Sequence, residues 1–364
     1  MKKIGILTFW GVPNYGAFAQ AYALNKVLKN SFKDVEVKHI AYLHRMHKDL
    51  YFKKTKPALT SYRCLFSPRF YLEWIRYCID SEIRYPAFSD DWNSIDNERI
   101  RTAKELEGSY YDIIVTGSDA IWEYSVPAFG DDVHLVGNEL NCNKLVSYAA
   151  SFGDMNPTDD FKDFIVKGLK QYDQISVRDL TSKEIVNNLV HRDDVHLVLD
   201  PTLVWNFKND TDIPESKYEK YILVYGNDFT DELINDVKNY AHKKGIIIIG
   251  AGIAPEWCDI RLTDVGPLEW IGLFKKAEFT VTCTFHGLMF SINYEKKVVF
   301  NQVDYVKNRS TSLLLELGLY ELFKDGTDLE TVINYDWDYK KINARLDMLR
   351  EDSFKFIRGI CDDE

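Results

Sequence analysis

Residues 280–292 read TVTCTFHGLMFSI, where a β-rich run gives way to an apolar segment with helical spacing. The run from Phe279 to Cys283 predicts a strand, and the residues after Gly287 predict a helix. His286 and Gly287 are therefore expected where the chain crosses from strand to helix. Backbone N–H groups at the start of a helix lack partners within the helix and attract anions. A substrate that carries phosphate is the first hypothesis.

The composition favours a globular protein of two domains. The chain has 364 residues, which fits two domains of roughly 150 residues each. Hydrophobic residues make up 46% and charged residues 28%, both globular values. The net charge of −11 argues against a nucleic-acid partner, because affinity for a phosphate backbone needs a basic face. An anionic substrate would have to be held by local cations and helix ends.

The ends and the cysteines indicate the cellular setting. The N-terminus enters a strand-like segment with no apolar leader before it, and we found no apolar run of about 20 residues. No signal peptide or transmembrane helix is expected, so we expect a cytoplasmic protein. The six cysteines show no C-x-x-C pair or Cys/His metal spacing, so we predict no metal site and no disulfide framework.

The N-terminal half has the rhythm of strands alternating with helices. A strand at 3–9, a glycine-rich loop at 10–16 and a helix at 17–29 come first, and the loop carries Asn14 and Tyr15. The glycines do not form the dinucleotide fingerprint, so the loop is either a phosphate site or a tight turn.

Two later strands end on charged residues. The strand 111–116 is followed by Ser118 and Asp119, at the strand end where ligands collect in open α/β sheets. Asp119 is either a catalytic carboxylate or a helix N-cap. The strand 174–177 ends on Arg178, whose fork suits a carboxylate or phosphate. The alternative for Arg178 is an ion pair with Asp179 or Asp200.

The pattern predicts an α/β fold of two doubly wound Rossmann-like domains facing across a cleft, with a C-terminal helix. The predicted parts are an N-terminal domain at 1–206 on the acceptor side, a linker at 207–219, a C-terminal domain at 220–335 on the donor side, and a helix in 336–364. In the second domain a loop at 306–310 is expected to lead into a helix at 312–317.

An insertion at about 44–105 interrupts the first domain. Its basic and aromatic residues are typical of a peripheral membrane contact. The alternative, which we favour, is a solvated helical excursion whose aromatic side chains pack on the domain. The residues concerned are Arg45, Lys48, Lys53, Lys54, Lys56, Arg63, Arg69 and Arg76, with Tyr51, Phe52, Tyr62, Phe66, Phe70, Tyr71 and Trp74.

Seven short segments, taken in order, resemble the polysaccharide pyruvyl transferase family. The resemblance covers most of the chain but little of 44–105. The segments are Trp10-Gly11 with Asn14-Tyr15-Gly16, Gly117-Ser118-Asp119 with Trp122, Ser147 to Gly153, Ser176-Val177-Arg178, Asp200-Pro201-Thr202, Phe285-His286-Gly287, and Asn308-Arg309.

This resemblance implies a fold similar to that of GT-B glycosyltransferases. It also implies transfer of a pyruvyl group from phosphoenolpyruvate to two hydroxyls of a sugar, in a polysaccharide or a lipid-linked oligosaccharide, which gives a cyclic ketal and phosphate. Phosphoenolpyruvate is the donor substrate, and no cofactor or metal is implied. The inner face of the cytoplasmic membrane is then the expected place of action.

Roles for individual residues follow from the resemblance, from the chemistry of the reaction and from position in the chain. Arg178 and His286 match donor-site residues. His286 is the candidate general acid and Asp119 the candidate base. The helix end is expected to lower the pKa of His286 and a bound phosphate to raise it; a structural histidine is the alternative. The candidate substrate-binding residues are Arg178, Thr284, Phe285, Gly287, Arg309, Lys307, Asn14, Tyr15 and Ser118.

One position departs from the family pattern. Some members carry an arginine where this chain has Thr284. Arg309 or Lys307 would have to supply the missing cation. Two other functions stay open: a nucleotide-sugar glycosyltransferase of the GT-B type, and a non-catalytic, membrane-associated sugar-binding protein built around the insertion.

Overall fold

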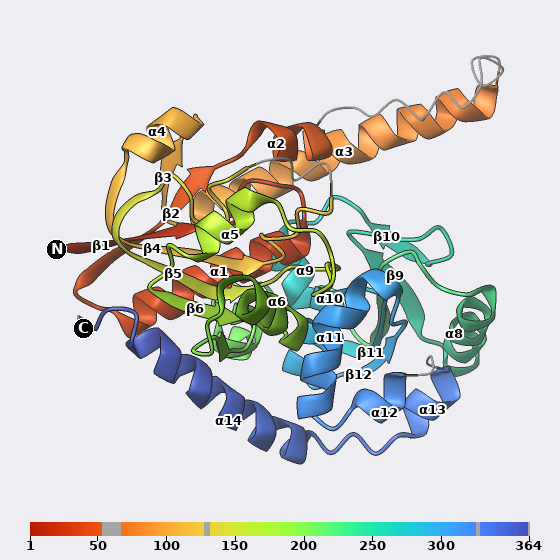
Figure 1. Cartoon of the computed structure of the whole chain (residues 1–364). Coiled ribbons are helices and arrows are strands. Elements are labelled where there is room, and N and C mark those ends of the chain that lie inside the picture. Colours follow the sequence, from red (N-terminus) through yellow and green to blue (C-terminus); the bar gives the residue numbers. More distant parts are fainter. Residues whose placement is uncertain (53–66, 127–131, 325–327, 363–364) are drawn as a thin grey trace.

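The computed structural model describes residues 1–52, 67–126, 132–324 and 328–362, in which the chain forms two parallel β-sheets flanked by helices (Figure 1). The first sheet has the strand order β3-β2-β1-β4-β5-β6-β7, and the second has the order β10-β9-β8-β11-β12. The strands of the first sheet are β1 (Lys2–Leu7), β2 (Val35–Tyr42), β3 (Asn97–Ile100), β4 (Tyr110–Asp119), β5 (Asn141–Ala150), β6 (Gln174–Val177) and β7 (His196–Leu197). Those of the second are β8 (Tyr221–Tyr225), β9 (Ile247–Ala251), β10 (Ile260–Leu262), β11 (Ala277–Thr282) and β12 (Lys297–Phe300).

Both sheets are wound in the same way. Each starts with a central strand, moves outward over two strands to one edge, and then returns to the other side of the first strand. This is the doubly wound, Rossmann-like order, so the predicted fold class is confirmed. The order reverses between β1 and β4 in the first sheet and between β8 and β11 in the second, and ligands bind at such points in open α/β sheets.

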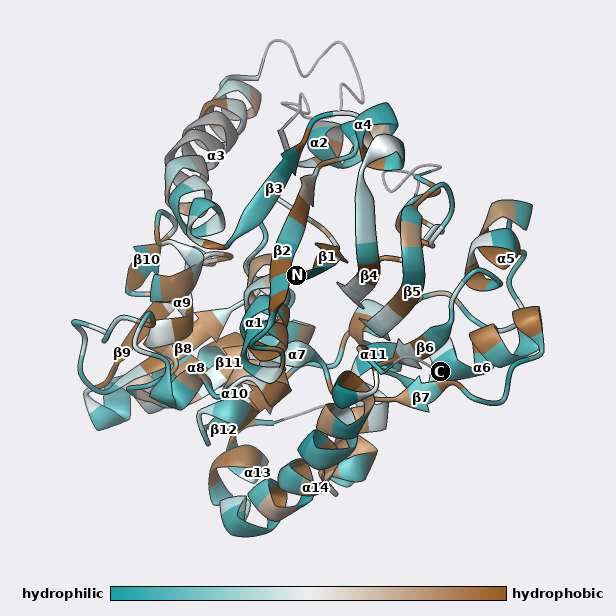
Figure 2. Ribbon diagram, turned by 90° about the vertical axis from the view of Figure 1, so that its left-hand side faces the viewer, coloured by the Kyte–Doolittle hydropathy of each residue, from teal (hydrophilic) through white to brown (hydrophobic). Residues whose placement is uncertain are grey.

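Helices surround the sheets, and apolar strands fill the interior (Figure 2). The strands β8 and β11 are buried along almost their whole length, as expected of parallel strands covered on both faces. The helices are α1 (Tyr15–Ser31), α2 (Arg45–Phe52), α3 (Pro68–Ser94), α4 (Ala103–Gly108), α5 (Asp163–Leu169), α6 (Leu180–Val190), α7 (Pro201–Val204), α8 (Asp231–Lys244), α9 (Pro267–Leu273), α10 (Phe285–Asn293), α11 (Asp304–Glu316), α12 (Tyr320–Phe323), α13 (Leu329–Asn334) and α14 (Tyr339–Arg358), with a 3₁₀ turn η3 at Phe207–Asn209.

Helix α1 joins the two halves. It is buried on nearly all sides, which a helix shows when it lies between two layers rather than on a surface. Its Phe18 belongs to the same hydrophobic cluster as Trp270 of α9 and Phe290 of α10. The Tyr15 hydroxyl donates to the carbonyl of Val265 at 2.9 Å. The start of α1 is therefore fixed against the second half of the molecule.

The C-terminal helix α14 returns to the first sheet, passing along one side of the molecule (Figure 1). The backbone N–H of Leu199 donates to Ser353 Oγ at 2.9 Å, and Arg350 Nε donates to the carbonyl of Leu203 at 2.7 Å. The predicted boundaries between domains and linker stay a prediction.

The range 44–105 holds α2, α3 and α4, and it also contributes the strand β3, which pairs with β2. Trp92 anchors α3, since its indole Nε1 donates to the carbonyl of Val12 at 3.0 Å. The predicted basic and aromatic residues between 53 and 66 lie outside the described residues. None of the described helices is both long and apolar enough to cross a membrane.

One predicted boundary was wrong. The helix expected at 312–317 begins at Asp304, so the segment 306–310 is helical and not a loop. An acidic residue in the first turn suits a helix start, and this places Lys307 and Arg309 on α11.

Candidate functional site

Residues at the carboxyl ends of strands from both sheets meet in one place. Asp119 ends β4, Arg178 follows β6, and Phe285 and His286 open α10 after β11. The Arg178 guanidinium lies 4.6 Å from the centroid of the Phe285 ring. The two halves of the molecule thus share one site.

Arg178 is bound between two carboxylates. Its Nη1 donates to Asp200 Oδ2 at 2.7 Å, and its Nη2 donates to Asp119 Oδ1 at 3.1 Å. Burial alone would lower the pKa of Arg178, but Asp119 and Asp200 outweigh it and raise that pKa. The ion pair that the sequence offered as an alternative exists with Asp200, while Asp179 caps α6. Of the three guanidinium nitrogens of Arg178, Nε is the one buried without a hydrogen-bond partner among the described residues.

Asp119 sits on a strained turn and does not cap a helix. It has a left-handed φ of 81°, and its Oδ1 accepts from the N–H of Ala120 at 2.9 Å. The residues after it form turns, so the N-cap interpretation is wrong. Burial acts to raise the pKa of Asp119, but the charges of Arg178 and His286 outweigh it and lower that pKa. The carboxylate is therefore ionised at neutral pH and is a weak base.

The start of α10 is built by a threonine and a glycine. Thr284 is the N-cap, and its Oγ1 accepts from the N–H of Gly287 at 3.1 Å. A Cβ on Gly287 would lie 2.1 Å from Thr282 Oγ1, so only glycine fits there. The N–H groups of Phe285 and His286 donate to no residue that the structure describes. They are available to an anion.

The His286 ring is buried against α1. A Cβ on Gly16 would lie only 2.2 Å from His286 Nδ1, so the ring rests directly on the glycine. His286 Nε2 is buried without a hydrogen bond among the described residues, and it lies 3.9 Å from Asp200 Oδ2. This geometry does not describe a satisfied structural histidine.

The pKa of His286 is lowered, chiefly by burial. Asp200 and Asp119 oppose that effect, and the charges of Arg178 and Arg309 add to it. The direction agrees with the expectation from the helix end, but burial is the larger cause. His286 is therefore neutral at pH 7 while the site is unliganded.

Of the two cations proposed to compensate for Thr284, only Arg309 lies at this site. Its Nη2 is 3.7 Å from Asp154 Oδ1, and its charge acts on the pKa values of both Asp119 and His286. Lys307 is exposed on α11 and has no described contact with these residues.

Asn14, Tyr15 and Ser118 support the site through packing and hydrogen bonds. Asn14 caps α1 by accepting from the N–H of Ala17 at 3.1 Å, and Tyr15 is buried as described above. Ser118 Oγ donates to Asp200 Oδ2 at 3.3 Å.

Two acidic residues of the site were not predicted as site residues. Asp200 was named in one of the segments that resemble the family and as a possible partner for Arg178, without a role in the site. Glu123 is buried, and burial is the main cause that raises its pKa to about 7. Its Oε2 packs on Gly153, where a Cβ would lie 2.0 Å away. The signal for Glu123 was its place just after the end of a central strand.

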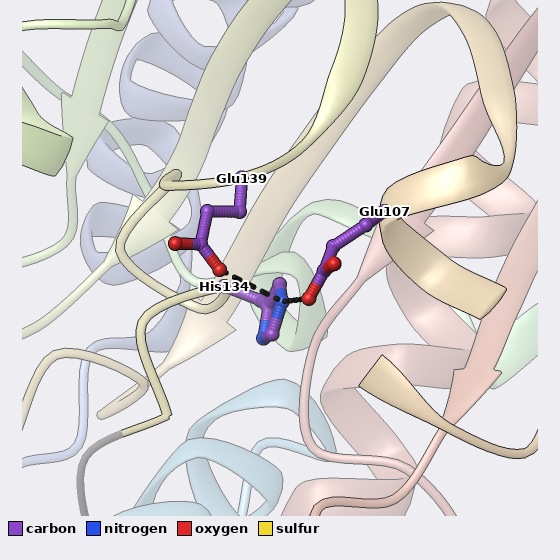
Figure 3. Close-up of side chains that lie close together, drawn as sticks. All are labelled: Glu107, His134 and Glu139. Atoms are coloured by element: carbon purple, nitrogen blue, oxygen red, sulfur yellow. Dashed lines mark hydrogen bonds and ion pairs between the residues drawn. The ribbon is translucent and has the colours of Figure 1, made fainter. Parts of the chain in front are cut away.

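A separate group could hold a metal ion: Glu107, His134 and Glu139, whose ligand atoms lie within 4.8 Å of one another (Figure 3). His134 Nε2 is 3.3 Å from Glu107 Oε1, and its Nδ1 is 2.9 Å from Asp132 Oδ1. Burial would lower the pKa of His134, but hydrogen bonds and charges from Asp132 and Glu107 outweigh it and raise that pKa, so the carboxylates favour the protonated ring. Among the described residues no such group surrounds His286. The expectation of no metal stays a prediction.

Comparisons with known proteins identify a family. A model described as polysaccharide pyruvyl transferase matches residues 14–300. No curated protein matches the sequence. Similar solved structures include MnaA of S. aureus with UDP (12% identity, 94% of this chain and 90% of that one, TM-score 0.49). A putative UDP-N-acetylglucosamine 2-epimerase from Listeria monocytogenes (11%, 96% and 90%, 0.48) and the wall teichoic acid polymerase TagF (12%, 98% and 88%, 0.47) are also similar. Likeness at this level says nothing about what this chain binds.

Proposed function

The chain belongs to the polysaccharide pyruvyl transferase family, and we propose that it transfers the pyruvyl group of phosphoenolpyruvate to two hydroxyls of a sugar. The acceptor sugar would belong to a polysaccharide or a lipid-linked oligosaccharide. The observation that supports this most is the start of α10. It brings two free N–H groups and an unpartnered histidine nitrogen to a site shared by both sheets.

The reaction has two steps. The first sugar hydroxyl adds to C2 of phosphoenolpyruvate while C3 takes a proton and becomes a methyl group. The second hydroxyl then displaces phosphate from C2, which closes the cyclic ketal and releases inorganic phosphate. The reaction needs a proton donor for C3 and a base for the hydroxyls. The scheme uses no cofactor, because phosphoenolpyruvate is itself a substrate.

The anionic donor would bind at the positively polarised N-terminus of α10, beside Arg309. Its phosphate would lie at the N–H groups of Phe285 and His286, with Arg309 beside it. The negative charge of the donor would raise the pKa of His286, so the ring would be protonated only when the donor is present. His286 is the proposed proton donor to C3.

Two carboxyl groups share the work of the base in this proposal. Asp119 is ionised but weakly basic because its pKa is lowered, which suits it to orient the attacking hydroxyl. Glu123, with a pKa of about 7, is the better proton acceptor at neutral pH.

The decisive experiment measures phosphate release from phosphoenolpyruvate against a panel of lipid-linked oligosaccharides. The expected result is acceptor-dependent release, which His286→Gln abolishes. Normal turnover of that variant across the pH range would rule out the acid role. A thermal-shift measurement distinguishes the pyruvyl transferase from the glycosyltransferase alternative, because a ligand that binds only the native state raises the melting temperature of the protein. Stabilisation by nucleotide-diphosphate sugars and not by phosphoenolpyruvate would contradict the proposal.

We also propose that the protein acts at the inner face of the cytoplasmic membrane. In support, the described part of α3 exposes Tyr71, Leu72 and Ile75. Such side chains suit an interfacial contact. Co-sedimentation with anionic vesicles tests this, and Leu72→Ser with Ile75→Ser is expected to abolish it. Equal sedimentation of the wild type with and without vesicles would contradict it.

A further inference from the structure

A cavity of about 1150 Å³ lies at the carboxyl ends of β1, β2 and β3. Trp10 lies just beyond β1, Tyr42 ends β2, and Ile100 ends β3; all three line the cavity. This is the same edge of the sheet that carries Asp119 and Arg178. The cavity opens on the side where α/β proteins bind ligands, and its volume lies slightly above the roughly 300–1,000 Å³ of typical small-molecule sites.

The described wall of the cavity carries four cations and no carboxylate. Arg45 and Lys48 of α2 line it, as do Arg99 and Arg101 near the end of β3, and no Asp or Glu is among the lining residues. Among the residues whose side chains the structure describes, none forms an ion pair or a hydrogen bond with these four side chains, while the carboxylate of Glu105 accepts from the backbone N–H of Arg101 at 2.8 Å. Four cations thus line one cavity of a chain whose net charge is −11.

The pairing of other basic residues shows the contrast. Lys26 pairs with Asp212, and Lys275 pairs with Glu215 at 2.9 Å. Cations that line one cavity repel one another, and an anion among them would offset that repulsion. The cavity is therefore prepared for a negatively charged ligand.

The same cavity offers aromatic surface. Trp10 and Trp92 line it, with ring centroids 4.7 Å apart, and the indole N–H of Trp92 is fixed by its bond to Val12. Trp10 is half-buried, so part of its ring faces the open space. Fixed aromatic rings beside polar groups suit a sugar, whose ring has an apolar face and a polar edge.

Helix α2 connects the cavity with the site at Asp119. Arg45 and Lys48 face the cavity, and Tyr51, three residues further on, lies 3.5 Å from Asn14 Nδ2. Burial raises the pKa of the Tyr51 hydroxyl, and the charge of Asp119 adds to that rise, which places the two groups within electrostatic range. A ligand along α2 would extend about 9 Å from Arg45 to Tyr51, the residue on which the charge of Asp119 acts.

We propose that this cavity binds the anionic part of the acceptor, a sugar whose phosphate or carboxylate group lies among Arg45, Lys48, Arg99 and Arg101. The reaction at the far end rests on the function proposed above; the binding of an anionic sugar does not. The acceptor is then an acidic glycan or a diphosphate-linked one, and a neutral glycan is a poor ligand.

The test compares three forms of one disaccharide by calorimetry: a neutral methyl glycoside, the 1-diphosphate, and the form with a uronate. At least one charged form is expected to bind about tenfold more tightly than the neutral form, with an affinity that falls as salt rises. Preference for the diphosphate indicates a lipid-linked acceptor, and preference for the uronate indicates an acidic repeat unit. Equal binding of all three forms would overturn the proposal.

The variant Arg99→Gln with Arg101→Gln should lose at least about tenfold in affinity for the charged sugar. Lys33→Gln with Lys104→Gln is the matched control, because it removes two exposed positive charges outside the cavity. Both variants change exposed side chains, so both should keep the wild-type melting temperature. Equal losses in the two variants would mean that only net charge matters, which contradicts a site.

Two measurements with phosphoenolpyruvate, thermal stabilisation and phosphate release, distinguish failure of this proposal from failure of the proposed function. The variant Arg99→Gln with Arg101→Gln should retain stabilisation by phosphoenolpyruvate in a thermal shift. Loss of that stabilisation would make the cavity the donor site and would overturn the acceptor proposal. It is also possible to separate the two outcomes directly. If no sugar promotes phosphate release but binding of the charged sugar still depends on Arg99 and Arg101, the acceptor cavity is supported and the proposed reaction is wrong.

Discussion

The carboxyl group of Glu123 should make the stability of this protein depend on pH in a way that one substitution removes. Glu123 is only 7% exposed, and burial raises its pKa from 4.5 to about 7, although Arg309 opposes the rise. The fold thus favours the protonated side chain. In Glu123→Gln a neutral amide of nearly the same shape takes its place, so the cost of burying a charge disappears.

The magnitude follows from the two pKa values of Glu123. Because the folded-state pKa lies above the unfolded one, the full stability is present below pH 4.5 and is lost as the pH rises through about 7. The difference between the folded-state and unfolded-state pKa values of Glu123 corresponds to a change in the free energy of unfolding on the order of 3 kcal/mol. Glu123→Gln should therefore match the wild type near pH 4.5 and exceed its free energy of unfolding by that amount well above pH 7.

Urea unfolding at several pH values between about 5 and 8 measures this difference. Other titrating groups are shared by the two proteins, so they cancel when the two free energies are subtracted. Glu184→Gln, at an exposed position of α6, is the matched control and should follow the wild type at every pH. Parallel curves for Glu123→Gln and the wild type would refute the reasoning, since they would mean that Glu123 is ionised at no cost.

Three further predictions concern packing and buried charge. Gly16→Ala places a methyl group 2.2 Å from His286 Nδ1; the ring must move by about 1 Å, so we expect a roughly 100-fold loss of phosphate release, while Gly108→Ala, with open space around its Cβ, behaves as the wild type. Asp200→Asn removes one carboxylate from the buried guanidinium and should lower the free energy of unfolding by about 3 kcal/mol in urea; an unchanged value would mean that the pair is solvated. Asp210→Ala removes the acceptor of a tyrosine O–H and an indole N–H and should cost about 2 kcal/mol in the same assay, with no cost if water replaces both bonds.

Most of the fold could be predicted because its strands are buried on both faces. Such strands read as short apolar runs between polar residues, and β6 was predicted at the residues where it occurs. The strand β3 has the sequence NERI and was missed, because an edge strand with polar side chains lacks that signal. The early start of α11 was missed because its first two turns are mostly polar, with Tyr305 and Val306 adjacent rather than at helical spacing.

The site could be predicted only as far as strand ends determine it. Asp119, Arg178 and His286 each follow a strand, and the strand order brings strand ends of one sheet to the same edge. Their partners depend on how the two sheets pack. No local pattern places Gly16 against the His286 ring, and no local pattern buries Glu123. The direction of the pKa of His286 was predicted from the helix end, whereas burial between the two halves proved to be the larger cause.

Thr284 stands where some family members carry an arginine, and its position shows how this difference affects the first turn of α10. As the N-cap, Thr284 holds the first turn of α10, and loss of such a cap costs about 1 kcal/mol. An arginine there would bring a cation but could not cap the helix in the same way. The cations nearest to this turn are already matched, since Arg178 lies between two carboxylates and Arg309 lies beside Asp154. An anion bound at this turn would therefore depend on backbone N–H groups that the threonine keeps in position, while the unpaired cations stand in the separate cavity beside α2.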